Sequence, residues 1–315
     1  MTRHLFILNP AAGTKNRTEK LKEAIGALKL TDEYDIYTTN GVRAAENEVC
    51  RYLKEHSEDF VRIYACGGDG TLCEVANGVY RSESKSCAIA VVPIGSGNDF
   101  IKSLDIPAER FLNLRELVNG QTVDVDLLLA RDAVGDERVS LNIISAGFDA
   151  AVAHGQERIK KWPLVSGKAA YNISLVKSVF TKTKHYFVLN VDGKRFGDSA
   201  GPYLFAIAAN GKFYGGGFKA SPYSDISDGV MEFIRIDTVS PIKLLSLVSR
   251  FREGRHIDEL KDIVVSTRCK SMQFVSDKPI DINLDGEIYP MKNPKIKILG
   301  KAVKMILPSS LVTQD

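Results

Sequence analysis

Gly67-Gly68-Asp69-Gly70-Thr71 and Gly95-Ser96-Gly97-Asn98-Asp99-Phe100 are two glycine-rich runs that begin 28 residues apart. Each follows an apolar run that is typical of a buried strand. After the first run, the apolar residues of 72–79 fall on one helical stripe, so this run joins a strand to a helix N-terminus. Glycines let backbone amides approach a phosphate, and a helix N-terminus adds unpaired amides and a partial positive charge. The two runs therefore predict a phosphate-binding site that serves ATP.

Asp69 lies in the middle of the first run. A carboxylate would repel a phosphate unless it faces a metal ion or a substrate hydroxyl, so Asp69 favours phosphoryl transfer over nucleotide storage. The residue could instead cap the N-terminus of the following helix. The presence of two such turns in one chain favours the phosphate site.

Strands and helices alternate from residue 4 to about residue 119. The expected strands are 4–8, 34–38, 61–66 and 87–92, and the expected helices are 16–29, 43–55, 71–81 and 107–119. This order predicts an α/β N-terminal domain with a doubly wound parallel sheet over residues 1–122. Ligands bind such sheets beyond the C-terminal strand ends, where the turns 9–14, 67–71 and 94–98 all fall.

The pattern changes beyond Gln121 to runs of β type. These runs are 123–130, 139–145, 186–191, 203–208, 231–236 and 263–275, with helical interruptions at 148–161 and 167–183. We expect a mainly antiparallel β C-terminal domain over residues 123–315.

The composition is that of a globular chain. It has 315 residues, of which 44% are hydrophobic, and a formal net charge of +3. No run approaches the roughly 18 apolar residues of a membrane span, and residues 1–8 lack the apolar core of a signal peptide. The five cysteines are odd in number and show no C-x-x-C spacing, which indicates reduced thiols. We therefore expect a cytoplasmic protein.

Four segments resemble the diacylglycerol kinase catalytic domain family in its soluble bacterial lipid-kinase form. They are Asn9-Pro10-Ala11-Ala12-Gly13, the GGDGT run continuing to Gly78, Pro93 to Phe100, and Leu284-Asp285-Gly286-Glu287. GGDGT alone also occurs in NAD kinases and phosphofructokinases, but GSGNDF and LDGE in this order are specific. No P-loop and no G-x-G-x-x-G fingerprint is present. The resemblance covers nearly the whole chain and implies that about 295–315 returns to pack on the first domain.

The resemblance implies a site for ATP with Mg²⁺. In this family a threonine after the second strand contacts the nucleotide, and the spacing to Ala44 favours Thr38 over Thr39. The expected nucleotide-binding residues are Asn9, Pro10, Ala11, Ala12, Gly13, Thr38, Gly67, Gly68, Asp69, Gly70, Thr71, Leu72, Cys73, Gly95, Ser96, Gly97, Asn98 and Asp99.

A second acidic motif, Asp225-Ile226-Ser227-Asp228-Gly229-Val230, places two carboxylates three residues apart before a glycine. Both could reach one hard cation, although a solvated Asp-Gly hairpin explains the residues nearly as well. The motif resembles the family's structural Mg²⁺ loop. That resemblance implies Asp225, Asp228 and the carbonyl of Val230 as ligands.

Asp285-Gly286 is a strong hairpin signal between two β runs, so the purely structural interpretation is a two-residue turn. The turn can also carry a catalytic carboxylate. The resemblance assigns the general base to this acidic run, which makes Glu287, Asp285 and Asp69 the catalytic candidates.

Seven Lys or Arg and no Asp or Glu occupy 158–184, with Trp162 beside the first cluster. The segment is either a solvated helical face or a docking surface for an anionic membrane.

Together these features predict an ATP-dependent lipid kinase that phosphorylates a hydroxyl of diacylglycerol or a related lipid. We expect it to contact the inner face of the membrane only transiently and to have no nucleic-acid partner. The sequence does not decide between a monomer and a homodimer. The alternatives are an NAD kinase-like phosphotransferase, which GSGNDF disfavours, and a non-catalytic nucleotide or lipid sensor, which the retained carboxylates disfavour.

Overall fold

The computed structural model describes residues 1–13, 17–148, 184–197 and 200–309. The contacts divide the chain into two compact units. Unit 1 holds Met1–Leu127 and Gly300–Asp315, and unit 2 holds Leu128–Leu299. The division falls inside strand β5 (Gln121–Arg131), a few residues after the predicted boundary at 122/123.

Unit 1 is built on a parallel sheet. Strand β1 (Thr2–Leu8) lies between β2 (Glu33–Thr38) and β3 (Phe60–Gly67), and β4 (Cys87–Pro93) follows β3. All three pairings are parallel, and β1, β3 and β4 read as nearly continuous apolar runs because both faces of the sheet are covered. In the order β2-β1-β3-β4, the chain first moves from β1 to β2 at one edge and then returns past β1 to β3 and β4. This change in the direction of winding between β1 and β3 confirms the doubly wound sheet.

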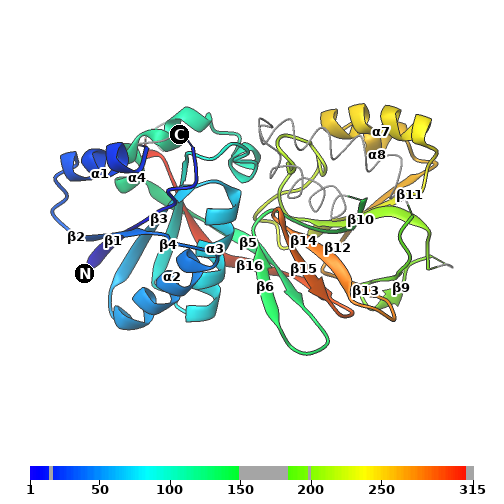
Figure 1. Ribbon diagram of the computed structural model, residues 1–315, viewed down its shortest axis with the longest axis horizontal. Coiled ribbons are helices and arrows are strands. Elements are labelled where there is room, and N and C mark those ends of the chain that lie inside the picture. The colour runs from blue at the N-terminus through cyan, green and yellow to red at the C-terminus, as the bar shows by residue number, and fades with distance from the viewer. Residues whose placement is uncertain (14–16, 149–183, 198–199, 310–315) are drawn as a thin grey trace. The chain divides into compact units, whose positions relative to one another are not determined.

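Helices cover this sheet on both faces. Right-handed crossovers place α1 (Arg17–Ala27) on one face and α2 (Ala44–Glu55) with α3 (Asp69–Ser82) on the other (Figure 1). Helices α2 and α3 approach closely at Gly78, where a Cβ atom would lie 2.6 Å from the backbone oxygen of Glu46.

The single helix predicted over 107–119 is wrong. The structure has a 3-10 helix η2 (Ala108–Leu112) and a short α4 (Leu114–Val118) instead. Asn113 separates them because its backbone is extended and its side chain accepts a hydrogen bond from the amide of Glu116, which caps α4. A further 3-10 helix, η1 (Phe100–Leu104), follows the second glycine run.

Unit 2 contains a six-stranded sheet in the order β12-β11-β10-β7-β14-β15, and all its pairings are antiparallel, as predicted. Its strands are β7 (Ile143–Gly147), β10 (Tyr203–Ala209), β11 (Met231–Asp237), β12 (Val264–Cys269), β14 (Ile280–Leu284) and β15 (Glu287–Met291). The other strands of unit 2 are β6 (Glu137–Ser140), β8 (Val188–Val191), β9 (Lys194–Arg195) and β13 (Ser271–Val275). Strand β16 (Lys295–Leu307) begins in unit 2 and ends in unit 1.

Both faces of the central strands β7 and β10 of the six-stranded sheet are buried. Ala206 and Ala208 of β10 join a core that includes Phe274 of β13, while Ile207 faces a second core. The second core is closed by α7 (Pro241–Glu253). A strand buried on both faces needs apolar residues throughout, which explains the uninterrupted run at 203–209.

Helix α7 was missed, although its end signals are present in the sequence. Ser240 caps its first turn, Pro241 follows at the first helical position, and Gly254 ends the helix with a φ of 78°. A short α8 (His256–Glu259) comes next. The sequence predicted helices in this domain only at 148–161 and 167–183, so α7 and α8 correct that prediction.

Two predicted strands are each divided. The run 139–145 is broken into β6 and β7 by a turn at residues 141–142, and the run 263–275 is broken into β12 and β13 at Lys270. The helices expected at 148–161 and 167–183 lie outside the described residues, apart from Phe148. In unit 1, the end of β16 pairs in parallel with β4 through Met305 and Ile89.

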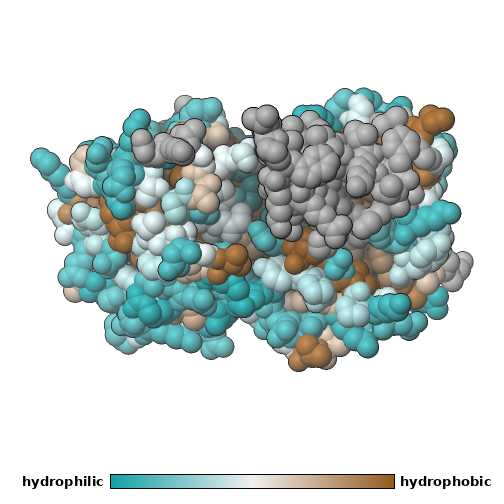
Figure 2. Space-filling model, viewed as in Figure 1, coloured by the Kyte–Doolittle hydropathy of each residue, from teal (hydrophilic) through white to brown (hydrophobic). Residues whose placement is uncertain are grey.

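The visible surface is mostly hydrophilic outside the grey atoms, and its hydrophobic residues are scattered (Figure 2). Among the described residues, exposed large apolar side chains include Val42, Val134 and Ile242. None of the described helices is long and apolar enough to cross a membrane.

Candidate functional site

The three predicted phosphate loops leave the same edge of the unit 1 sheet. Leu8, the last residue of β1, is in register with Thr38 of β2 and Cys66 of β3. Gly67 of β3 is likewise in register with Pro93 of β4. The loops therefore begin side by side at the switch point between β1 and β3, where doubly wound sheets bind ligands.

The first loop is attached to the second. The Asn9 amide donates to the backbone oxygen of Cys66 at 3.0 Å, and Asn9 Nδ2 donates to Thr71 Oγ1 at 2.9 Å. Asn9 Oδ1 also accepts from the amide of Ala11 at 2.9 Å, which shapes the turn. Gly13 has a φ of 81°, and a Cβ atom there would lie 2.9 Å from the oxygen of Ile94. The first loop thus also touches the third.

The two glycine runs pack directly against each other. A Cβ atom on Gly95 would lie only 2.5 Å from the Cα of Gly68. A Cβ atom on Gly67 would lie 2.1 Å from Thr71 Oγ1. At Gly95 the absence of a side chain lets the two backbones approach closely, and at Gly67 it leaves room for the side chain of Thr71.

Asp69 joins the two runs through its carboxylate. Its Oδ1 accepts hydrogen bonds from the amides of Asp99 at 2.7 Å and Phe100 at 3.2 Å. The N-cap of α3 is Gly68, which has no side chain to cap it, so Asp69 does not cap its own helix. The carboxylate instead binds the first amides of the segment that begins η1, and Oδ2 would lie 2.9 Å from a Cβ atom on Gly97.

Asn98 places an acceptor against the glycine runs. Its Nδ2 donates to the oxygens of Gly95 at 2.9 Å and Pro93 at 3.3 Å, which fixes the orientation of the amide. Its Oδ1 is buried and has no hydrogen-bond partner in the part of the chain that the structure describes. This oxygen would lie 3.0 Å from a Cβ atom on Gly95 and 3.9 Å from one on Gly68. We call the backbone of Gly67, Gly68, Gly95 and Gly97 with Asn98 Oδ1 the cradle.

The cradle suits a magnesium-bound nucleotide. Backbone amides at the start of α3 lack intrahelical acceptors and can bind phosphate oxygens. The orphaned oxygen of Asn98 needs a donor or a hard cation, and an amide oxygen is a suitable ligand for either. A ligand that brings anionic oxygens together with a cation or hydroxyls satisfies both requirements.

Two residues of this site were not singled out from the sequence. Lys102 forms an ion pair with Asp99 at 2.5 Å, because Asp99 precedes η1 and Lys102 lies three positions later, one turn of the 3-10 helix away. Glu74 binds the amides of Arg43 at 2.9 Å and Ala45 at 3.0 Å with its two carboxylate oxygens. Glu74 thereby ties α3 to the start of α2, just beyond the strand that ends at Thr38. Glu74 belongs to the quoted GGDGT segment, but only the fold reveals its partners.

The acidic run at the β14–β15 turn belongs to unit 2. Asp285 and Gly286 form a two-residue turn with φ values of 49° and 102°, as expected for an Asp-Gly hairpin. The Asp285 carboxylate accepts from Ser140 Oγ at 2.7 Å and from the amides of Leu141 at 3.0 Å and Ile143 at 2.9 Å. Burial raises the pKa of the Asp285 carboxyl, and these hydrogen bonds oppose that shift.

Asp285 is thus engaged in holding the turn, whereas Glu287 is exposed at the start of β15. Of the three catalytic candidates, Asp69 is in unit 1, and Asp285 and Glu287 are in unit 2. Their roles stay predictions.

The predicted metal loop is closed by its own hydrogen bonds. Asp225 Oδ1 accepts from the amide and hydroxyl of Ser227 at 2.9 and 2.8 Å, and Asp228 Oδ1 accepts from the amide of Val230 at 3.1 Å. Asp228 also forms an ion pair with Arg268. Among the described residues, no group of three or more His, Cys, Asp or Glu is placed to hold a metal ion. The assignment of two carboxylates and one carbonyl to a cation is therefore still a prediction.

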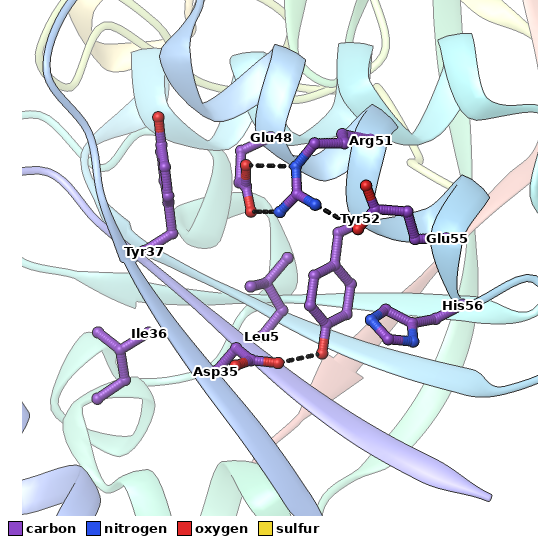
Figure 3. Close-up of a pocket in the computed structure, with 9 residues that line it drawn as sticks. All are labelled: Leu5, Asp35, Ile36, Tyr37, Glu48, Arg51, Tyr52, Glu55 and His56. Atoms are coloured by element: carbon purple, nitrogen blue, oxygen red, sulfur yellow. Dashed lines mark hydrogen bonds and ion pairs between the residues drawn. The ribbon is translucent and has the colours of Figure 1, made fainter.

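A pocket of about 300 Å³ lies elsewhere in unit 1, between β2 and α2 (Figure 3). Arg51 binds Glu48 and Glu55 inside it, and the Tyr52 hydroxyl donates to Asp35 Oδ2 at 2.7 Å. Its charged groups are paired with one another, and none of the predicted site residues lines it.

The basic segment lies mostly outside the described residues. Of its seven cations only Lys184 is described, and it is exposed.

Comparisons with known proteins agree with the two-unit architecture. The diacylglycerol kinase catalytic domain matches residues 3–130, and the YegS C-terminal NAD kinase beta sandwich-like domain matches residues 142–307. A protein from Xanthomonas oryzae pv. oryzae named "Probable lipid kinase YegS-like" is 28% identical over 314 residues, which is 96% of each chain.

Two crystal structures from Bacillus anthracis str. Sterne share the fold. One, described as a diacylglycerol kinase, superposes with a TM-score of 0.67 at 18% identity over 98% of both chains. The other has a TM-score of 0.73 at 19% identity and covers 98% of this chain and 97% of its own.

Proposed function

Because the chain belongs to the family of diacylglycerol kinase catalytic domains followed by a YegS-type C-terminal domain, we propose that it transfers the γ-phosphoryl group of ATP to a lipid hydroxyl. The acceptor is diacylglycerol or a related lipid, and the product is phosphatidic acid or its analogue. The cradle carries this proposal, since two glycine runs meet there and a Cβ atom at Gly67 or Gly95 would clash with neighbouring atoms.

Unit 1 would hold the nucleotide. The amides at the start of α3 bind phosphate oxygens, and the first loop, fixed to Thr71 by Asn9, closes the same edge. Asp69 keeps the second glycine run in place through the amides of Asp99 and Phe100. Lys102 adds a positive charge next to Asp99. Mg²⁺, when bound with ATP, would neutralise phosphate charge as phosphoryl transfer proceeds.

Unit 2 would supply the proton acceptor. We assign the base to Glu287, because Asp285 is committed to three hydrogen bonds that order the turn. The acceptor hydroxyl gives its proton to Glu287 as its oxygen forms the new bond to phosphorus and the bond to ADP breaks. Positioning and charge neutralisation supply the rest of the catalysis.

A lipid acceptor also implies where in the cell the protein acts. A lipid acceptor requires contact with a bilayer, and we propose that the basic segment 158–184 provides it transiently at the inner face of the membrane. An NAD kinase activity is the alternative, because the C-terminal domain is described as NAD kinase-like.

The test is a transfer assay with γ-labelled ATP against diacylglycerol, monoacylglycerol, ceramide, phosphatidylglycerol and NAD. We expect label in a lipid product and none in NADP. The matched control is Gly68→Asp, because the cradle has room for a side chain at Gly68 and a carboxylate there repels phosphate. Label in NADP alone, or no transfer by a protein that binds ATP, would refute the lipid kinase assignment.

A further inference from the structure

Polar side chains gather at one end of the six-stranded sheet of unit 2. Strand β7 lies between β10 and β14, so the residues at this end of all three strands are neighbours. The turn at 140–143 wraps the Asp285 carboxylate, and Asn210 Nδ2 donates to the oxygen of Leu141 at 2.7 Å. Ser140, Asn142, Asn210 and Asn283 are all buried. Such a concentration of buried polar groups under the turn that carries Glu287 calls for an explanation.

Asn142 lies at the centre of this polar end and is only 4% exposed. Its backbone oxygen accepts from the amides of Asn210 at 2.9 Å and Gly211 at 3.0 Å. Its side-chain Nδ2 donates to the backbone oxygen of Phe213. Its Oδ1 has no hydrogen-bond partner among the residues that the structure describes.

The identity of the orphaned atom follows from the neighbouring carbonyl. If the amide were turned over, its oxygen would face the oxygen of Phe213, and two acceptors would repel each other. The unpartnered atom is therefore an acceptor. Leaving a buried acceptor without a donor is destabilising, and none of the described residues supplies a donor, so we expect a ligand to supply it.

We infer that Asn142 Oδ1 accepts a hydrogen bond from the acceptor lipid, from a donor other than the hydroxyl that is phosphorylated. This inference rests on the proposed lipid kinase function. The reacting hydroxyl carries one proton, which goes to Glu287, so it cannot also bind Asn142. The preferred acceptor therefore has a second donor close to the reacting hydroxyl, as a vicinal diol or an amido alcohol has. Diacylglycerol has one hydroxyl and no N–H group, and so lacks this donor.

The backbone next to Asn142 can yield to an entering head group. Phe213 leads into Gly215, Gly216 and Gly217, which have φ values of 61°, 85° and 112°. Glycine adopts these left-handed conformations without strain and gives the segment more conformational freedom than other residues would.

The experiment compares two acceptors that differ only in the second donor. They are 1-monooleoylglycerol and its 2-O-methyl ether, which keeps the primary hydroxyl. We expect the wild-type kcat/KM to be higher for the diol by on the order of tenfold or more, because the ether leaves the buried oxygen unpaired. A wild-type ratio near one would overturn the inference and would mean that water satisfies Asn142. Transfer to diacylglycerol but to neither of these lipids would also overturn the inference, whereas no transfer to any of the lipids would instead refute the proposed function.

Two variants locate the effect at one atom. Asn142→Ala removes the acceptor, so the ratio of the two kcat/KM values should fall to near one, mainly through loss of activity on the diol. Asn142→Asp keeps an acceptor oxygen while it removes the donor to Phe213, and should retain the preference. A ratio retained in Asn142→Ala would overturn the assignment to Asn142. If the variants fail to fold, the wild-type comparison still decides.

Discussion

Gly68 and Gly95 face each other in the cradle, but they tolerate a methyl group differently. A Cβ atom on Gly68 would make an ordinary contact, 3.4 Å from the Cα of Gly95. A Cβ atom on Gly95 would lie 2.5 Å from the Cα of Gly68, where two backbone segments would have to separate. The sequence predicts a cradle at both glycines, but only the structure separates a ligand-facing position from a packing position.

We therefore expect Gly68→Ala to weaken ATP binding without changing the melting temperature, because the methyl enters the space of the phosphates. Gly95→Ala should lower both the ATP affinity and the free energy of unfolding, the latter by about 1–3 kcal/mol. Isothermal titration calorimetry and thermal unfolding measure the two effects. Unchanged ATP affinity in Gly68→Ala would place the phosphates elsewhere.

Glu287 and Asp285 differ in environment, which separates their expected roles. Glu287→Gln should lower kcat by roughly 10²–10⁴-fold at nearly unchanged ATP affinity and melting temperature, since it removes an exposed proton acceptor. Asp285→Asn should instead destabilise unit 2 by about 1–3 kcal/mol, because an amide N–H₂ group would face the donors at residues 140–143. Steady-state kinetics with calorimetry tests both. A near-normal kcat in Glu287→Gln would transfer the base to Asp285 or Asp69.

His256 is expected to make unit 2 sensitive to acid. It is fully buried, its Nε2 lies 3.1 Å from the oxygen of Ala220, and burial lowers its pKa to about 4. Between the unfolded value of about 6.5 and this pKa, the unfolded state binds the extra proton, so stability falls as the pH falls.

From pH 7 to pH 5 this effect should remove about 2 kcal/mol from the unfolding free energy of unit 2. His256→Gln can still donate to Ala220 but cannot be protonated, so it is the matched control. Urea unfolding of both proteins at the two pH values isolates the histidine from the titrating carboxylates. An identical loss in the variant would exclude His256 as the cause.

Helices α2 and α3 pack closely against each other. Gly78 of α3 packs against α2, where a Cβ atom would meet the oxygen of Glu46 at 2.6 Å and the Cβ of Val49 at 2.7 Å. Gly26 of α1 has no neighbour within 4 Å of its Cβ position. The same substitution in these two helices therefore has opposite consequences.

Gly78→Ala should destabilise unit 1 by about 1–3 kcal/mol, since two backbones must move apart. Gly26→Ala should stabilise it by about 0.4–1 kcal/mol, because alanine reduces the entropy of the unfolded chain and favours the helix. Chemical denaturation measures both. Equal changes in the two variants would show that α2 and α3 do not pack as closely as the structure places them.

The elements that sequence periodicity predicted well are those whose burial is uniform. β1, β3 and β4 are continuous apolar runs, and α3 follows a glycine run with an apolar stripe. The errors occurred where a side chain redirects the backbone. Asn113 caps α4 and thereby divides a predicted helix. The Asp285 carboxylate binds the amides of Leu141 and Ile143, where the predicted strand 139–145 turns between β6 and β7.

Helix α7 illustrates a different limit. Its residues Leu244, Leu247 and Phe251 pack on the second core of unit 2, and its ends carry ordinary capping residues. Because the C-terminal domain was interpreted as mainly β, no helix was predicted over these residues, although the capping residues at both ends were sufficient to predict one. The motifs of the candidate site were also visible in the sequence. The partners of Asp69, Glu74 and Asn142 were not, because each is distant in the chain.

The whole molecule consists of two units with their own cores, but unit 1 is discontinuous in sequence. The end of β16 pairs with β4 through Met305, which lies more than 200 residues after the glycine runs, so this distant strand completes the sheet that carries them. No periodicity within residues 1–127 can reveal this strand, since the information lies at the other end of the chain. The resemblance to a known family supplied the expectation instead.

Met305 and Met291 test this arrangement as a matched pair. Both are buried, Met305 in β16 within unit 1 and Met291 in β15 within unit 2. Met305→Ala should destabilise unit 1 by about 2–5 kcal/mol, because it leaves a cavity beside β4. Met291→Ala should destabilise unit 2 by a similar amount.

Differential scanning calorimetry with and without ATP distinguishes the two units. ATP should raise the transition of unit 1 and leave that of unit 2 in place, because a ligand stabilises only the unit that binds it. Met305→Ala should then lower the ATP-sensitive transition, and Met291→Ala should lower the other one. If Met291→Ala shifted the ATP-sensitive transition as strongly as Met305→Ala, the two units would unfold as one cooperative body, and β16 would not belong specifically to the nucleotide-binding sheet.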